Sequence, residues 1–227
     1  MTRHLYELCG TDPERRFSPF CWRARMALAH KGLHAETVPW RFTETDRLAF
    51  ANHDKVPVLV DGERAIGDSW AIAEYLEETY PEQPSLFNGN KAHVRFIMAW
   101  TDVTINAALI RLIVSDIPPL LDTGQAAYFR ETREKRFGQP LEDVTKDREA
   151  RLPAFRAALT PLRLVLGRQR FVGGDAPDYS DYIVFGSFMW ARVVSPLKLL
   201  EEDDPIHAWR ERMLDLHGGL ARDVPHA

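Results

Sequence analysis

Ser18, Pro19 and Cys21 stand where a short alternating segment gives way to a helical pattern. A serine followed by proline is typical of a helix N-cap and the first helical residue. The free N–H groups and the positive dipole end of such a helix favour an anion, and a thiol held there can have its pKa lowered from about 8.5 towards 7. A plain cap at Ser18, with Cys21 facing the core, explains the same residues. The motif alone leaves both interpretations open.

Other chemical signatures are weak. The eight histidines are scattered, and His30 and His34 have helical i,i+4 spacing but are separated by Gly32, where a helix should end. They make a poor metal pair, and we expect no metal site. The sequence has no glycine-rich nucleotide loop, no G-x-S-x-G elbow and no H-E-x-x-H motif.

Charge and composition exclude several partners. The formal charge of −4 and the pI near 6.1 argue against nucleic acid. The arginine-rich stretch 130–136 is interrupted by Glu131 and Glu134, which indicates a solvated helix face with i,i+4 ion pairs. No run approaches the roughly 18 apolar residues that span a bilayer, and the N-terminus does not resemble a signal peptide. We therefore expect a cytoplasmic protein without a membrane segment, in which Cys9 and Cys21 stay thiols.

Residues 1–82 have the changing periodicity of an α/β domain. Strands are expected over residues 4–8, 36–38, 56–60 and 64–66. Helices are expected over residues 19–30 and 43–52, and from Asp68 or Ser69 to about residue 80. The element order is β-α-β-α-β-β-α.

Residues 90–227 show helical signals only. Helices are expected over residues 90–115, 141–167, 178–194 and 205–217. The third of these is apolar on nearly every face, which predicts a helix buried inside its domain. The proline-rich stretch 81–90 separates this all-α domain from the first.

This combination resembles the glutathione transferase family over nearly the whole chain. The resemblance is carried by the thioredoxin-like element order, by Val56-Pro57 at the head of the third strand, and by Asp68-Ser69 opening the last helix of the first domain. The segment 174–181 is similar to the family's capping segment, with Asp178 where the family usually has Ser or Thr. The resemblance implies a thioredoxin-like N-terminal domain, an all-α C-terminal domain and a homodimer.

The family's glutathione contacts carry over by position. Ser18 would interact with the glutathione sulfur, and the backbone of Val56 would pair with the cysteinyl unit. Asp68 and Ser69 would hold the γ-glutamyl end, unless they are only a helix cap. Lys55 would meet the glycyl carboxylate, unless it is an ordinary surface lysine. The resemblance also implies a cis peptide before Pro57, although composition alone favours trans.

Further residues have alternative roles. Ser18 replaces the cysteine of redox-active relatives, so thiol-disulfide chemistry would need Cys21. Trp22, Trp100 and Trp190 are candidates for an apolar substrate pocket, although buried core positions are the commoner case for tryptophan.

A finer resemblance points to the bacterial β-etherases and their fungal etherase-like relatives. It lies in residues 18–23, 68–76, 139–144 and 202–205, and in the long segment 117–139. Those enzymes use glutathione to cleave aryl ethers. Three functions are therefore considered: a glutathione transferase acting on a small apolar electrophile, a Cys21-dependent oxidoreductase, and a non-catalytic protein that binds apolar ligands.

Overall fold

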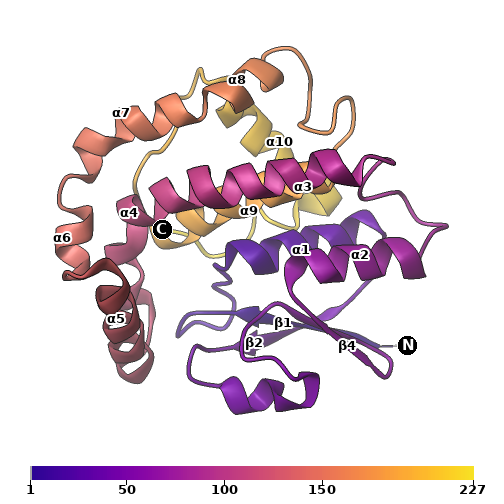
Figure 1. Ribbon diagram of the computed structural model, residues 1–227, viewed down its shortest axis with the longest axis horizontal. Coiled ribbons are helices and arrows are strands. Elements are labelled where there is room, and N and C mark those ends of the chain that lie inside the picture. The colour runs from indigo at the N-terminus through magenta and orange to yellow at the C-terminus, as the bar shows by residue number, and fades with distance from the viewer. Residues whose placement is uncertain (1) are drawn as a thin grey trace.

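A computed structural model describes residues 2–227, and its first part is an α/β unit (Figure 1). The strands and helices of this unit follow the predicted order. They are β1 (Arg3–Leu8), α1 (Pro19–His30), β2 (Glu36–Trp40), a 3₁₀ helix (Thr45–Ala51), β3 (Val58–Asp61), β4 (Arg64–Gly67) and α2 (Ser69–Thr79).

The four strands form one mixed sheet in the order β2-β1-β3-β4. Strand β1 is parallel to β2 and antiparallel to β3, which pairs antiparallel with β4. Helices α1 and α2 lie between this sheet and the helical part of the chain, while the 3₁₀ helix lies on the opposite side (Figure 1). The thioredoxin-like fold predicted for this region is confirmed.

The rest of the chain is helical, as predicted. Its α-helices are α3 (Lys91–Trp100), α4 (Ala107–Ile113), α5 (Thr123–Phe137), α6 (Leu141–Thr145), α7 (Arg148–Ala158), α8 (Thr160–Leu166), α9 (Tyr179–Val194) and α10 (Pro205–Gly219). A π-helical segment (Thr101–Asn106) joins α3 to α4, and short 3₁₀ helices occupy Val114–Asp116 and Pro118–Leu120.

The prediction of a single long helix was too coarse in one region. The expected helix over 141–167 is divided into three, and the break before α8 has a clear cause. Pro161 has no N–H to give to the carbonyl of Ala157, which instead accepts from the hydroxyl of Thr160 at 2.7 Å. The charged segment before residue 139 contains the separate helix α5.

Helix α9 is buried along almost its whole length, as its sequence predicts. A capping box begins it: the Asp178 side chain accepts from the backbone N–H of Ser180 at 2.8 Å, and Asp181 accepts from the N–H of Asp178 at 3.2 Å. Asp181 also accepts from the indole N–H of Trp209 at 2.8 Å. The acidic cap therefore replaces a Ser or Thr cap without loss of hydrogen bonding.

Helix α9 packs directly on α1, and Gly186 makes this contact possible. A Cβ atom at Gly186 would lie 2.4 Å from the carbonyl oxygen of Pro19, a separation that real structures do not show. An ion pair reinforces the same junction: the buried guanidinium of Arg23 on α1 lies 2.6 Å from Asp102 of the π-helical segment. The start of α1 is thus fixed against the helical part of the chain.

The continuous helical stretch Lys91–Asp116 corrects the expectation that no segment is long and apolar enough to cross a membrane. By length and composition alone this stretch qualifies. The polar residues Thr101, Asp102 and Asn106 interrupt its apolar run and hid it from a search for uninterrupted hydrophobicity. In the fold it packs along α9, and Asp102 is paired with Arg23.

Candidate active site

Ser18 stands at the N-cap of α1, as predicted. Its hydroxyl oxygen accepts from the backbone N–H of Cys21 at 3.3 Å, and its side chain is almost completely buried at 5% exposure. A hydroxyl has one donor in addition to its acceptor lone pairs. The O–H of Ser18 therefore remains able to donate to an anion held at the helix start, where the dipole favours negative charge.

Ser18 opens into a cavity of about 620 Å³ between the α/β unit and the helices. Of the predicted site residues, Ser18, Lys55, Val56 and Trp190 line it. Its aromatic and cationic lining also includes Phe17, Phe20, Trp40, Phe42, Tyr128, Phe129, Arg133 and Arg136. Figure 1 shows α5 on the same side of the α/β unit as the loop that follows β2.

The Val56–Pro57 peptide is cis, as the resemblance implies, although composition alone favoured trans. Val56 lies two residues before β3 and lines the cavity. The N–H of Asp68 donates to the carbonyl of Pro57 at 3.2 Å. This bond places the start of α2 next to the end of the cavity at which Val56 lies.

Asp68 has an unusual backbone for a residue other than glycine, with φ of 72°. Its carboxylate caps α2 by accepting from the N–H groups of Trp70 at 2.9 Å and Ala71 at 3.1 Å. Such conformations persist at functional sites when neighbouring contacts hold them. Ser69 is the first residue of α2, so its N–H has no acceptor within the helix.

The carbonyl of Ser69 is bound from the helical part of the chain. The hydroxyl of Tyr179, at the start of α9, donates to it at 2.5 Å. The ring of Tyr179 also lies 6.1 Å from that of Trp70. Asp68 and Ser69 do not line the cavity themselves, but Asp68 is hydrogen-bonded to Pro57, which follows the cavity residue Val56.

Cys21 is unsuited to thiol chemistry. The side chain is 1% exposed, and burial raises the pKa of its thiol to about 12. A reactive thiol requires a lowered pKa and access to solvent. Cys9 is buried too, and both cysteines are free. The geometry therefore gives no support to the Cys21-dependent oxidoreductase.

The three tryptophans proposed for the substrate pocket lie in different parts of the structure. Trp190 of α9 lines the cavity. Trp22 is a core residue whose indole N–H donates to the carbonyl of Arg16 at 3.0 Å, and Trp100 is half-buried away from the cavity. Of the three tryptophans, the structure therefore brings only Trp190 to the cavity, because Trp22 is 1% exposed within the core and Trp100 stands at the end of α3 outside the cavity lining.

The cavity contains residues that the sequence did not indicate. The rings of Phe42 and Phe129 are 5.4 Å apart, and Tyr128 lies 6.3 Å from Phe42. Arg133, expected on a solvated face, lies over the rings of Phe42 at 5.1 Å and Phe129 at 4.8 Å. The spacing of Phe129, Arg133 and Arg136 is i, i+4, i+7, which puts them on one helix face and was the signal available.

The solvated face itself is present one turn earlier. Arg130 pairs with Glu134 at 3.3 Å, as the i,i+4 pattern predicts, and also with Glu142 at 2.6 Å. Helix α5 thus has an outer face of ion pairs and an inner face towards the cavity.

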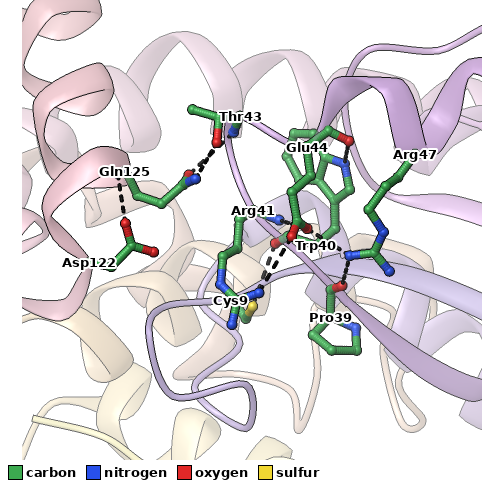
Figure 2. A network of polar contacts seen from close by, with 9 residues as sticks. All are labelled: Cys9, Pro39, Trp40, Arg41, Thr43, Glu44, Arg47, Asp122 and Gln125. Atoms are coloured by element: carbon green, nitrogen blue, oxygen red, sulfur yellow. Dashed lines mark hydrogen bonds and ion pairs between the residues drawn. The ribbon is translucent and has the colours of Figure 1, made fainter.

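Hydrogen bonds hold α5 against the α/β unit. Figure 2 shows Gln125 of α5 pointing to Thr43 in the loop after β2. The Gln125 amide donates to the Thr43 hydroxyl, and its oxygen accepts from the Thr43 N–H at 3.3 Å. Asp122 caps the helix by accepting from the N–H of Gln125 at 3.0 Å. The same loop is braced by Glu44, which accepts from the N–H of Arg41 at 3.0 Å.

Among residues 2–227, no group of three or more His, Cys, Asp or Glu side chains is arranged to hold a metal ion. The cavity is instead suited to an organic ligand that has both polar and aromatic parts.

Comparison with known proteins agrees with the fold. Residues 13–84 match the family model for the N-terminal domain of glutathione S-transferases, and residues 92–219 match the model for their C-terminal domain. The glutathione S-transferase-like protein ustS of Aspergillus flavus is 27% identical over 176 residues, which cover 72% of this chain. The chain spans only 59% of that relative's length.

Two solved structures are similar over almost the whole chain. Glutathione transferase GSTFuA3 from Phanerochaete chrysosporium has a TM-score of 0.78 and 25% identity, covering 96% of this chain and 92% of its own. The glutathione S-transferase CsGST63524 of Ceriporiopsis subvermispora, solved in complex with glutathione, has a TM-score of 0.81 and 22% identity, with both chains fully covered. With both halves matched, the chain belongs to the glutathione S-transferase family.

Proposed function

We propose that this protein is a glutathione transferase in which Ser18 binds the glutathione sulfur. The observation that carries the proposal is the cavity that begins at the Ser18 hydroxyl and continues to the aromatic side chains of the helical part. A hydroxyl that already accepts from the Cys21 N–H and keeps its own O–H for an anion suits a thiolate. The helix dipole of α1 adds to the stabilisation of that charge.

The remaining contacts follow the shape of an extended tripeptide. The backbone of Val56 pairs with the cysteinyl unit as a strand edge pairs with a peptide. The N–H and hydroxyl of Ser69 receive the γ-glutamyl carboxylate, and Asp68 receives its ammonium. Lys55, exposed at the cavity rim, meets the glycyl carboxylate.

Glutathione supplies a thiolate whose sulfur forms a carbon–sulfur bond while the leaving group departs with its bonding electrons. Ser18 keeps the sulfur ionised and directed into the cavity. Phe42, Tyr128, Phe129 and Trp190, here called the aromatic wall, hold the electrophile and exclude water.

Within this class, the resemblance to the etherase-like branch makes β-aryl ethers of aromatic ketones the first substrates to try. In such a reaction the sulfur bonds to the β-carbon, the carbon–oxygen bond breaks, and the phenolate that leaves takes a proton from solvent. A ketone with a fluorescent phenol as its leaving group makes this release directly measurable.

The decisive experiment compares Ser18→Ala with Ser18→Thr. Removal of the hydroxyl is expected to lower kcat/KM about 100-fold. Loss of one preorganised hydrogen-bond donor to a charged group, here the thiolate, typically has an effect of this size. Ser18→Thr retains a hydroxyl and a good cap and should keep most activity. Cys21→Ala is the matched control on the same helix turn and should retain turnover.

Three outcomes would contradict this assignment. Full activity of Ser18→Ala, with loss of activity in Cys21→Ala, would favour the oxidoreductase. Binding of apolar ligands without thiol consumption across a panel of electrophiles would favour the non-catalytic binding protein. A crystal soaked with glutathione that has its sulfur away from Ser18 would also overturn it.

A cytoplasmic homodimer is part of the same proposal. Large apolar side chains are exposed on both halves of the chain: Phe50 at 57%, Phe96 at 68% and Val103 at 74%. Light scattering of the wild type should give twice the 26.0 kDa chain mass, and Phe96→Asp should shift it to the single-chain mass.

A further inference from the structure

Two arginines on α5 face the substrate end of the cavity without an acid to neutralise them. Arg133 is half-buried, and its guanidinium lies over the rings of Phe42 and Phe129. Arg136 lines the cavity one turn further along. Within residues 2–227, no carboxylate lies within ion-pair distance of either guanidinium. Among the described residues, Arg133 makes one side-chain hydrogen bond, to the hydroxyl of Thr132 at 2.8 Å.

This pair contrasts with Arg130, the third arginine of the same helix. Arg130 has two glutamate partners, Glu134 and Glu142. Burial lowers the pKa of Arg133, the phenolic oxygen of Tyr128 offsets part of this effect, and the charge of Arg136 lowers the pKa further. Two like charges beside an apolar surface repel each other, and a bound anion would relieve this repulsion.

Other charges in the cavity do not supply that anion. Asp102 is occupied by Arg23 and by the side-chain amide of Asn106, which donates to it at 3.0 Å. Asp54 is adjacent in sequence to the cation Lys55, in the segment before β3. Glutathione brings a glycyl carboxylate, but Lys55 is the cation on its side of the cavity in the proposed function.

The arginines are also held in place. Hydrogen bonds in both directions between Gln125 and Thr43 fix the first turn of α5 to the loop after β2 (Figure 2). On the other side, the N–H of Thr11 donates to the carbonyl of Leu120 at 2.9 Å, just before α5 begins. A planar guanidinium stacked on two rings is then preorganised for bidentate binding of a carboxylate.

We propose that the electrophile carries an anionic group, a carboxylate, on an aromatic ring, and that Arg133 and Arg136 bind this group while the aromatic wall stacks on the ring. The proposal deepens the proposed function, since it names the substrate class of the same cavity. It makes Arg133 and Arg136 specificity residues that do not contact the reacting sulfur.

The test uses naphthoate and its neutral analogue naphthamide, two unreactive ligands of nearly the same shape. Their affinities for the wild-type protein are measured by calorimetry, without glutathione. We expect naphthoate to bind about tenfold more tightly than naphthamide, because one charge-assisted hydrogen bond contributes about this much affinity. Arg133→Gln and Arg136→Gln should each reduce this preference, and the double variant should abolish it.

Lys135→Gln is the matched control, because it removes one exposed positive charge of α5 that does not line the cavity. It should keep the full preference for naphthoate. Arg133→Lys retains the charge but not the planar fork, and should keep part of the preference. Circular dichroism of each variant shows whether it is folded. If Arg133→Gln fails to fold, Arg136→Gln, at an exposed position, still tests whether the arginines bind the carboxylate.

A second arm measures the affinity for glutathione in the same variants, and we expect it to be unchanged. A wild-type protein that binds both naphthalene ligands equally would overturn the proposal. So would loss of glutathione affinity in Arg133→Gln with the naphthoate preference intact, because the arginines would then belong to the glycyl carboxylate. Failure of the wild type to bind glutathione at all would contradict the proposed function, while the naphthoate comparison would still test the arginines.

Discussion

The two sides of the cavity are built from different kinds of groups. On one side, Ser18, Lys55 and Val56 line the cavity, and Asp68 and Ser69 stand next to them, where the N–H of Asp68 donates to the carbonyl of Pro57. These five residues are here called the polar wall. Most of their groups come from the ends of elements: an N-cap hydroxyl, the residues before a strand and a helix start. The aromatic wall opposite consists of side chains from α5, α9 and the loop after β2. Backbone geometry fixes the first side, and side-chain packing fixes the second.

Because the two walls differ in this way, substitutions in them should have different consequences. Changes in the polar wall should alter glutathione binding or the ionisation of its sulfur, while changes in the aromatic wall should alter the choice of electrophile. The contacts of α1 with α9 and the π-helical segment hold the two walls together. Breaking those contacts should damage both properties at once.

The largest effect is expected from Asp102→Ala, which leaves the buried guanidinium of Arg23 without its anion. Removal of one partner from such a pair typically costs 3–5 kcal/mol, and because Asp102 is partly exposed we expect about 3 kcal/mol from urea unfolding. Asp147→Ala removes one partner of the exposed pair with Arg151 at 3.8 Å and should cost less than about 1 kcal/mol. Equal losses in both variants would show that the Arg23 pair does not hold the walls together.

A smaller loss is expected from Gly186→Ala, because its methyl group would occupy the space of the Pro19 carbonyl oxygen, 2.4 Å away. Overpacking of this kind costs about 2 kcal/mol, and displacement of α1 should also lower kcat/KM. Gly124→Ala is the control: its Cβ would be 3.6 Å from the nearest atom outside its chain neighbours, Asp122 Oδ1. That variant should be as stable as the wild type or slightly more stable, measured by thermal unfolding. A harmless Gly186→Ala would contradict the close packing of α1 on α9.

The smallest effect on stability is expected at Asp68, where two substitutions separate its capping role from its charge. Asp68→Ala removes the cap at a position with positive φ and should cost about 1 kcal/mol, whereas Asp68→Gly fits that backbone and should cost less than about 0.5 kcal/mol. If the carboxylate meets the glutathione ammonium, both variants should bind glutathione about tenfold more weakly by calorimetry. Unchanged affinity in Asp68→Gly would reduce Asp68 to a helix cap.

The α/β unit was predicted more completely than the helical part for a physical reason. Its elements are short and bounded by local signals, such as the Ser18 cap, the turn at Gly62 and the Asp68 cap, and these act within a few residues. The divisions of the 141–167 region depend on Pro161 and on packing partners distant in sequence. The inward face of α5 was missed because the charged stretch 130–136 indicated only a solvated helix face.

The sequence by itself determined the order of the elements in the α/β unit, the buried character of α9 and the residues that begin α1 and α2. These properties follow from local hydrogen bonding and from hydrophobic periodicity, which each segment carries in its own residues. The family was indicated by the resemblance of motifs. Only the tertiary structure decided that Arg133 turns inward over Phe42 while Arg130 turns outward to Glu142. The aromatic wall was decided in the same way, since its rings come from segments up to about 150 residues apart that meet only when α5 and α9 pack beside the sheet.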